Sequence, residues 1–193
     1  MPRDILLLGP QGAGKGTQAR RIAAEYELPH IATGDMLRAA ISDGTPLGEE
    51  VEGVVNAGDL VSDELMIALI RERLAQEDTR SGFVLDGFPR TTAQAGALDQ
   101  LLREIGRAFS VIFALQIPDS VAFDRLRLRA QVEGRADDTD EAIRRRLENY
   151  HRETEPLIEY YRVRGNLVTI HGERSEGEVF AELQRALEQV AVA

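Results

Sequence analysis

The sequence predicts an α/β fold in which a doubly wound parallel sheet of about five strands carries helices on both faces. The prediction depends on an alternation along the chain. Short apolar runs are followed by segments whose apolar residues recur at helical spacing. The length of 193 residues suits one domain. With 43% hydrophobic and 29% charged residues, the chain can form both a packed core and a solvated surface.

The expected strands and helices follow one another in a regular order. The apolar runs that predict strands are residues 4–9, 30–32, 82–86, 109–117 and 167–171. The apolar stripes that predict helices are Ala19, Ile22, Ala23 and Tyr26, then Leu65, Leu69, Ile70 and Leu74, and finally Phe180, Leu183, Leu187 and Val190. Strands that alternate with helices indicate a parallel sheet covered on both sides.

Two segments do not follow this order. Residues 33–61 are helical in pattern and rich in glycine and charge, and residues 129–138 are polar and contain a glycine. Each segment is either a small excursion from the core or an ordinary surface connection. Polar loops beside a rigid scaffold often act as lids, but the pattern alone leaves both interpretations open.

Composition excludes several classes of function. A net charge of −10 does not provide a general phosphate-binding surface, so we expect no nucleic acid partner. The apolar runs are far shorter than the roughly 20 residues that span a membrane, so we expect no membrane association. The first run is also too short for the core of a signal peptide, so we expect a cytoplasmic protein. The absence of cysteine excludes disulfides and thiolate metal sites, and we expect no zinc.

Residues 9–17, which read GPQGAGKGT, are the first candidate site. They follow a predicted strand, begin a helix and match the P-loop pattern, except that Gly16 separates Lys15 from Thr17. Glycines let the backbone N–H groups surround a phosphate, and the helix N-terminus favours an anion. Lys15 is the only lysine among 23 basic residues, which indicates a position that needs a compact charge. The plain alternative is a glycine-rich turn without a ligand.

Two more segments make the pattern specific: Thr33-Gly-Asp-Met-Leu-Arg38 and Asp86-Gly-Phe-Pro-Arg90-Thr. Together with the loop and with the Asp-Asp-Thr run after an arginine-rich segment, they resemble the adenylate kinases of the nucleoside monophosphate kinase family. The resemblance covers nearly the whole chain and fits the short-lid form. It implies a monomer that transfers phosphoryl reversibly from ATP to AMP, with Mg²⁺, to give two ADP. It also implies a core of residues 1–31, 62–127 and 139–193, an AMP-binding excursion at 32–61 and a lid at 128–138.

The resemblance assigns the nucleotide contacts. For ATP they are Gly12, Ala13, Gly14, Lys15, Gly16, Thr17, Arg129 and Arg174. For AMP they are Thr33, Arg38, Asp59, Leu60, Val61, Gly87, Phe88, Pro89, Arg90, Gln94, Arg135 and Arg146. The Gln94 amide would pair with N1 and N6 of adenine. The plain alternatives are a helix N-cap for Thr33 and an exposed helix position for Gln94.

Catalysis would depend on Lys15, Arg90, Arg125, Arg135 and Arg146. Asp86 would hold Mg²⁺ through water, or would simply be a turn residue at the end of a strand. Any single arginine is more often a solvated helix charge, and we expect that role for a second set: Arg127, Arg144 and Arg145.

Three other functions compete with this one. UMP–CMP kinases resemble the chain, but they typically carry Ala and Asn where Thr33 and Gln94 stand. A P-loop GTPase needs an Asn-Lys-x-Asp motif, which a chain with lysine only at position 15 cannot contain. A catalytically silent nucleotide-binding module would lack the arginines of the acceptor side, which are present here.

Overall fold

The computed structural model describes residues 3–135 and 137–192, with side chains up to residue 189. Residue 136 of the expected lid and the side chain of Val190 lie outside this description. Within the described ranges, no helix combines the length and apolar character that a membrane span requires.

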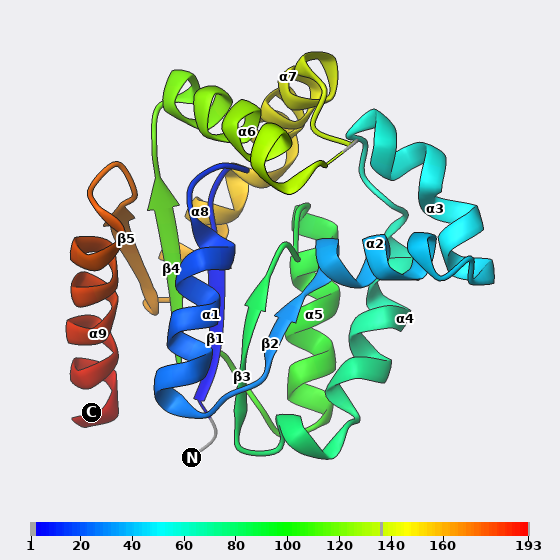
Figure 1. Cartoon of the computed structure of the whole chain (residues 1–193). Coiled ribbons are helices and arrows are strands. Elements are labelled where there is room, and N and C mark those ends of the chain that lie inside the picture. Colours follow the sequence, from blue (N-terminus) through cyan, green and yellow to red (C-terminus); the bar gives the residue numbers. More distant parts are fainter. Residues whose placement is uncertain (1–2, 136, 193) are drawn as a thin grey trace.

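A sheet of five parallel strands forms the centre of the molecule, as the sequence predicts (Figure 1). The strands are β1 (Arg3–Leu8), β2 (His30–Ala32), β3 (Gly82–Asp86), β4 (Val111–Gln116) and β5 (Leu167–His171). Their order in space is β2-β3-β1-β4-β5. The chain therefore leaves β1 toward one edge and later returns to the other side of it. Ligands of such sheets bind at this reversal point, beyond the carboxyl ends of the strands.

Helices cover both faces of the sheet because successive strand residues point to opposite sides. Ile5 and Leu7 of β1 pack against α1 and α9, whereas Leu6 and Leu8 face the core beneath α4, α5 and α8. These helices are α1 (Lys15–Tyr26), α4 (Asp63–Leu74), α5 (Thr92–Glu104), α8 (Pro156–Arg162) and α9 (Glu176–Val192). A short 3₁₀ helix, η1 (Glu77–Thr79), precedes β3.

The remaining helices lie at the carboxyl end of the sheet, where Figure 1 shows α6 and α7 above the strands and α2 and α3 to one side. They are α2 (Thr33–Ser42), α3 (Pro46–Ala57), α6 (Asp119–Glu133) and α7 (Asp140–Asn149), and a π-helix, η2 (Tyr150–Thr154), continues α7. A Cβ at Gly48 would lie 2.1 Å from the carbonyl oxygen of Ala40, so the close packing of α2 on α3 requires this glycine.

Helices α6 and α7 have a small core of their own. Ala122 and Leu126 of α6 pack against Ile143 and Leu147 of α7, apart from the two clusters on the sheet faces. Burial of these four apolar side chains holds the two helices together as a pair. Residues 128–133 of the expected lid belong to α6, so only the second part of the expected lid lies between the two helices.

A buried ion pair lies at the opposite end of the sheet. Asp4 of β1 is fully buried and accepts hydrogen bonds from Arg107 Nε, at 2.8 Å, and from Arg107 Nη2. Burial raises the pKa of Asp4, and the hydrogen bond and charge of Arg107 oppose that rise. The charged groups at this end are thus paired within the fold, away from the strand ends where ligands are expected.

Candidate functional site

A cavity of about 560 Å³ opens at the carboxyl end of the sheet. It lies between the β1–α1 loop, the α2–α3 pair, the end of β3 and the α6–α7 pair. Its lining includes every residue that the sequence predicted for the site. These are Gly12, Ala13, Gly14, Lys15, Gly16, Thr17, Thr33, Arg38, Asp59, Leu60, Val61, Asp86, Gly87, Phe88, Pro89, Arg90, Gln94, Arg125, Arg129, Arg135, Arg146 and Arg174.

The P-loop enters the cavity directly from β1. Gly12 has a φ of 83°, and a Cβ on it would lie 2.7 Å from the carbonyl oxygen of Ala122, so the loop packs tightly against α6. Helix α1 begins at Lys15 without a side-chain cap. Its N–H groups and the positive end of its dipole are therefore available to an anion.

The side chain of Lys15 extends back from α1 to the start of the loop. Its Nζ donates hydrogen bonds of 2.8 Å to the carbonyl oxygens of Gly9 and Pro10. Burial lowers the pKa of Lys15 to about 8. Asp86 opposes this shift, and Arg90 and Arg129 add to it. A fraction of Lys15 is therefore uncharged near neutral pH, and a bound anion would restore its full charge.

Positive charges are also crowded around Arg90. Burial lowers its pKa to about 10, the charges of Arg146 and Arg38 add to this shift, and Asp86 opposes it. Its Nε donates to the carbonyl oxygen of Gly87 at 2.7 Å. Like charges that are held this close repel one another, so the cavity favours a ligand with several negative charges.

Two adjacent carboxylates hold the arginines in place. Asp138, whose side chain is fully buried, accepts hydrogen bonds from Arg129 Nε at 2.8 Å and Nη2 at 2.9 Å, and from Arg146 Nη1. Asp137 accepts one from Arg146 Nη2 at 2.6 Å, and its carboxylate lies 3.7 Å from Arg38. Burial would raise the pKa of Asp137, but the bond and charge of Arg146 outweigh burial and lower it.

From the sequence alone, Asp137 and Asp138 are recognised only as part of the Asp-Asp-Thr motif. Their role in holding the guanidinium groups of Arg129, Arg146 and Arg38 was missed. A pattern was available, because two consecutive acids follow an arginine-rich segment. This pattern does not indicate which arginines contact the two aspartates in the folded chain.

The other arginines are held separately. Arg125 Nη1 donates to the carbonyl oxygens of Gly172, at 2.9 Å, and Gly12, at 3.5 Å, so it ties the loop after β5 to the P-loop. Arg135 pairs with Glu133 at 2.6 Å, and Arg174 pairs with Glu182 at 3.0 Å. Arg135 and Arg174 line the cavity, and their side chains have no described ion pair with Asp137 or Asp138, although the backbone N–H of Asp138 donates to the carbonyl oxygen of Arg135 at 3.2 Å.

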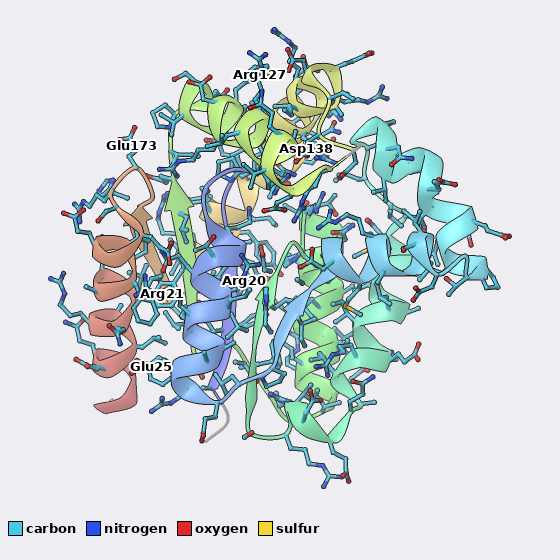
Figure 2. The ribbon with its side chains drawn as sticks, in the orientation of Figure 1. Arg20, Arg21, Glu25, Arg127, Asp138 and Glu173 are labelled. Atoms are coloured by element: carbon cyan, nitrogen blue, oxygen red, sulfur yellow. The ribbon has the colours of Figure 1, made fainter. Side chains whose placement is uncertain are left out.

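The three arginines that were expected to serve as surface charges are absent from the described lining of the cavity. Arg127 pairs with Asp140 at 3.2 Å, and Arg144 lies over the ring of Phe123. Figure 2 shows Arg127 on the outer side of α6 and α7, whereas Asp138 lies on the side toward the rest of the molecule. Arg145 pairs with Asp59, a contact between α7 and the end of α3 that the sequence did not indicate.

Thr33 and Gly87 meet at the other end of the cavity. Thr33 is the first residue of α2, whose N-cap is Ala32, so the N-cap alternative for Thr33 is wrong. Its Oγ1 donates to the carbonyl oxygen of Asp86 at 3.4 Å. Gly87 has a φ of 88°, and a Cβ there would lie 2.7 Å from Thr33 Oγ1. Glycine is therefore required for the chain to pass this close.

Gln94 is buried, which excludes the alternative of an exposed helix residue. It stands in the first turn of α5, where the side chain of the N-cap Thr91 accepts from its backbone N–H at 3.1 Å. Its Oε1 accepts from the backbone N–H of Arg90 at 2.8 Å, and its Nε2 donates to Asp63 Oδ1 at 2.7 Å. One amide hydrogen and one lone pair remain for a ligand.

Asp86 is a candidate for binding a divalent cation. Its side chain is 14% exposed and lies next to Lys15 and Gly16. Within residues 3–135 and 137–192, no group of three acidic or histidine side chains is arranged to hold a metal. A single carboxylate suits Mg²⁺, which typically keeps water and takes its other ligands from the phosphates of a nucleotide.

Comparison with known proteins gives one consistent result. A sequence model described as adenylate kinase matches residues 7–166. A protein named adenylate kinase from a Cyanothece species is 47% identical over 186 residues, which is 96% of this chain and 95% of the relative. Proteins of the same name from Xanthomonas campestris and Stenotrophomonas maltophilia are each 44% identical over 183 residues, covering 95% of this chain and 98% of each relative.

The single lysine allows a direct test of the site's electrostatics. Protein labelled with ¹³C at lysine Cε should give one lysine NMR signal, because Lys15 is the only lysine. We expect its titration midpoint near the value of about 8 that burial imposes. Inorganic tripolyphosphate should raise this midpoint, because a nearby anion favours the charged amine. A midpoint near the ordinary value of about 10.4, unmoved by tripolyphosphate, would contradict the described site.

Proposed function

The chain belongs to the adenylate kinase family, and from this premise we propose that the cavity binds ATP and AMP together and transfers the γ-phosphoryl group of ATP to AMP. The reaction is reversible and gives two ADP. The observation that supports this assignment most strongly is the arrangement of cations. Lys15 of the P-loop and Arg38 and Arg90 from the opposite side line one cavity with the arginines of α6 and α7.

The proposed mechanism requires little covalent chemistry from the protein. The phosphate of AMP is already an anionic nucleophile, so no general base is needed. Catalysis then consists of positioning the two nucleotides and stabilising the charge on the transferred group. Lys15 and the P-loop N–H groups would bind the β- and γ-phosphates of ATP, and Arg38 and Arg90 would hold the AMP phosphate. Arg125, Arg135 and Arg146 would complete the cage around the transferred group.

The resident aspartates have a defined part in this proposal. Asp137 and Asp138 accept hydrogen bonds from Arg129 and Arg146. Bound phosphates would take over part of this role, since guanidinium groups bind phosphate as readily as carboxylate. The two aspartates thus orient the guanidinium groups toward the proposed phosphate site.

We propose that residues 32–61 form the AMP-binding excursion and residues 128–138 the lid. The separate core of α6 and α7 supports a lid whose flanking helices move as a unit. Its closure would exclude water, which would otherwise hydrolyse ATP, and would bring Arg135 to the phosphates. The core would comprise residues 1–31, 62–127 and 139–193.

Mg²⁺ would arrive with ATP and be held through water by Asp86. When bound, it neutralises charge on the phosphate oxygens. The protein's own contribution there is the position of the Asp86 carboxylate beside Lys15. No zinc is required in this proposal.

Adenine is the proposed acceptor base because Thr33 and Gln94 both line the acceptor side of the cavity. The backbone of Asp59, Leu60 and Val61 would lie along the same base, and the ATP adenine would lie near Arg174. A UMP–CMP kinase is the less favoured alternative. We further propose a cytoplasmic monomer without nucleic acid or membrane partners.

The reaction itself provides the first test of this assignment. Protein mixed with ATP, AMP and Mg²⁺ should form ADP, and ADP alone should return ATP and AMP. With UMP as acceptor, kcat/KM should be at least about a hundredfold lower, because uracil presents a donor at N3 and an acceptor at O4, the reverse of the pattern that the buried Gln94 amide can satisfy. CMP should also be used less well, because the smaller pyrimidine ring does not fill the space of a purine. Equal or better use of UMP or CMP would reject adenine as the preferred base.

The lid arginines provide a second test, with a matched control. Arg135→Ala and Arg146→Ala should each lower kcat by about a hundredfold or more, because these groups act mainly in the closed ternary complex. The affinity of the free protein for ATP should change little. Arg127→Ala removes an arginine from the outer side of α6, where it is 56% exposed, and should leave kcat nearly unchanged.

Thermal unfolding separates catalysis from stability in this series. Arg146→Ala removes the partner of Asp137 and of the fully buried Asp138, so its Tm should fall. Arg135→Ala, whose partner Glu133 is 46% exposed, should keep its Tm. Wild-type kcat in both variants would show that residues 128–138 are an ordinary surface connection.

A further inference from the structure

We propose that Asp63 is a positioning residue that determines base specificity, because it fixes the Gln94 side-chain amide in the orientation that accepts adenine and rejects a 6-oxopurine. The inference extends the proposed function, since it assumes that Gln94 faces the acceptor base. Asp63 would act from outside the cavity, through a residue that lines it. Gln94 belongs to the described lining of the cavity, and Asp63 does not.

The contact joins two helices that are distant in sequence. Asp63 is the first residue of α4, directly after the N-cap Ser62, and Gln94 lies in the first turn of α5. Asp63 Oδ1 accepts from Gln94 Nε2 at 2.7 Å. The packing of α4 beside α5 brings these two first turns together, so the carboxylate supports the amide from the side away from the ligand.

The amide is fixed by two partners that cannot exchange roles. The carboxylate of Asp63 can only accept a hydrogen bond, so the group that faces it must be the NH₂ of Gln94. The backbone N–H of Arg90 can only donate, so the group that faces it must be the amide oxygen, which lies 2.8 Å away. A flipped amide would place two donors together and two acceptors together, and both contacts would be lost.

This fixed orientation matches adenine. The remaining Nε2 hydrogen can donate to N1 of adenine, and the remaining Oε1 lone pair can accept from the N6 amino group. Hypoxanthine has nearly the same shape but presents the opposite pattern, with a donor at N1 and an acceptor at O6. An IMP base would therefore require the flipped amide, which Asp63 and Arg90 together disfavour. Buried hydrogen-bonding groups left unpaired in this way give strong discrimination.

A simpler role for Asp63 is that of an acid in the first turn of a helix, where it would stabilise the helix dipole. Glu64, the next residue of the same turn, provides a matched control. The side chain of Glu64 is exposed. It lies in the same first turn of α4 as Asp63 but has no described contact with Gln94. Glu64→Gln thus removes a first-turn charge without touching the amide.

The experiment compares AMP and IMP in five variants: Asp63→Ala, Asp63→Asn, Glu64→Gln, Gln94→Leu and the double variant Asp63→Ala/Gln94→Leu. The measurement is the ratio of the inhibition constant of IMP to the KM of AMP. Asp63→Ala should lower this ratio by about tenfold, with KM for ATP unchanged. Asp63→Asn should also lower the ratio, because the Asn amide can donate as well as accept and therefore no longer opposes the flipped orientation of Gln94. Glu64→Gln should match the wild type.

The double variant tests whether Asp63 acts through Gln94. In the Gln94→Leu background, Asp63→Ala should cause no further change in the ratio. A wild-type ratio in a folded Asp63→Ala protein, or an equal loss in the Gln94→Leu background, would overturn the inference. These outcomes are distinct from failure of the proposed function, which would appear as a wild-type protein that does not phosphorylate AMP.

Discussion

Lys15, Arg38, Arg90, Arg129 and Arg146 surround one cavity, and their mutual repulsion must be balanced before any ligand is bound. The described part of the fold supplies four carboxylates for this purpose, and one of them, Asp35, accepts a hydrogen bond from Arg38 at 2.5 Å. Asp86 favours the charged form of Lys15 from the end of β3, and Asp137 and Asp138 bind the guanidinium groups from the segment before α7. A protein with a net charge of −10 thereby concentrates positive charge in one place. Elsewhere its acidic surface does not favour polyanions.

The parallel sheet makes this concentration possible. The carboxyl ends of β1 and β3 lie side by side, with Leu7 in register with Asp86. The P-loop and the Asp86–Arg90 segment are therefore neighbours although many residues separate them in sequence. Helices α6 and α7 contribute their arginines from a pair with a small core of its own, and α6 also packs on the P-loop at Ala122. The proposed lid closure would depend on how far this small core lets the segment between the two helices move independently of the sheet.

Local patterns were sufficient to predict much of this structure. The strands at residues 30–32, 82–86 and 167–171 were predicted at their observed bounds, since each is a short apolar run. The first predicted strand, residues 4–9, is displaced by one residue from β1, and Gly9 lies outside the strand because it turns the chain with a φ of 140°. Long-range partners could not be predicted in this way. The contacts of Asp63 with Gln94 and of Asp59 with Arg145 depend on how helices pack. The local sequence around each of these four residues contains no pattern that indicates its partner.

The central claim is that Lys15 supplies a preorganised positive charge to the transferred phosphate, and turnover of a Lys15→Met variant tests it most directly. Methionine keeps an unbranched side chain that is one atom shorter than that of lysine, so circular dichroism and Tm should stay close to those of the wild type. We expect kcat for ATP and AMP to fall by about a thousandfold, because a preorganised charge contributes several kcal/mol in the transition state. Turnover within about twofold of wild type in the folded variant, less than 0.5 kcal/mol in the barrier, would contradict the account.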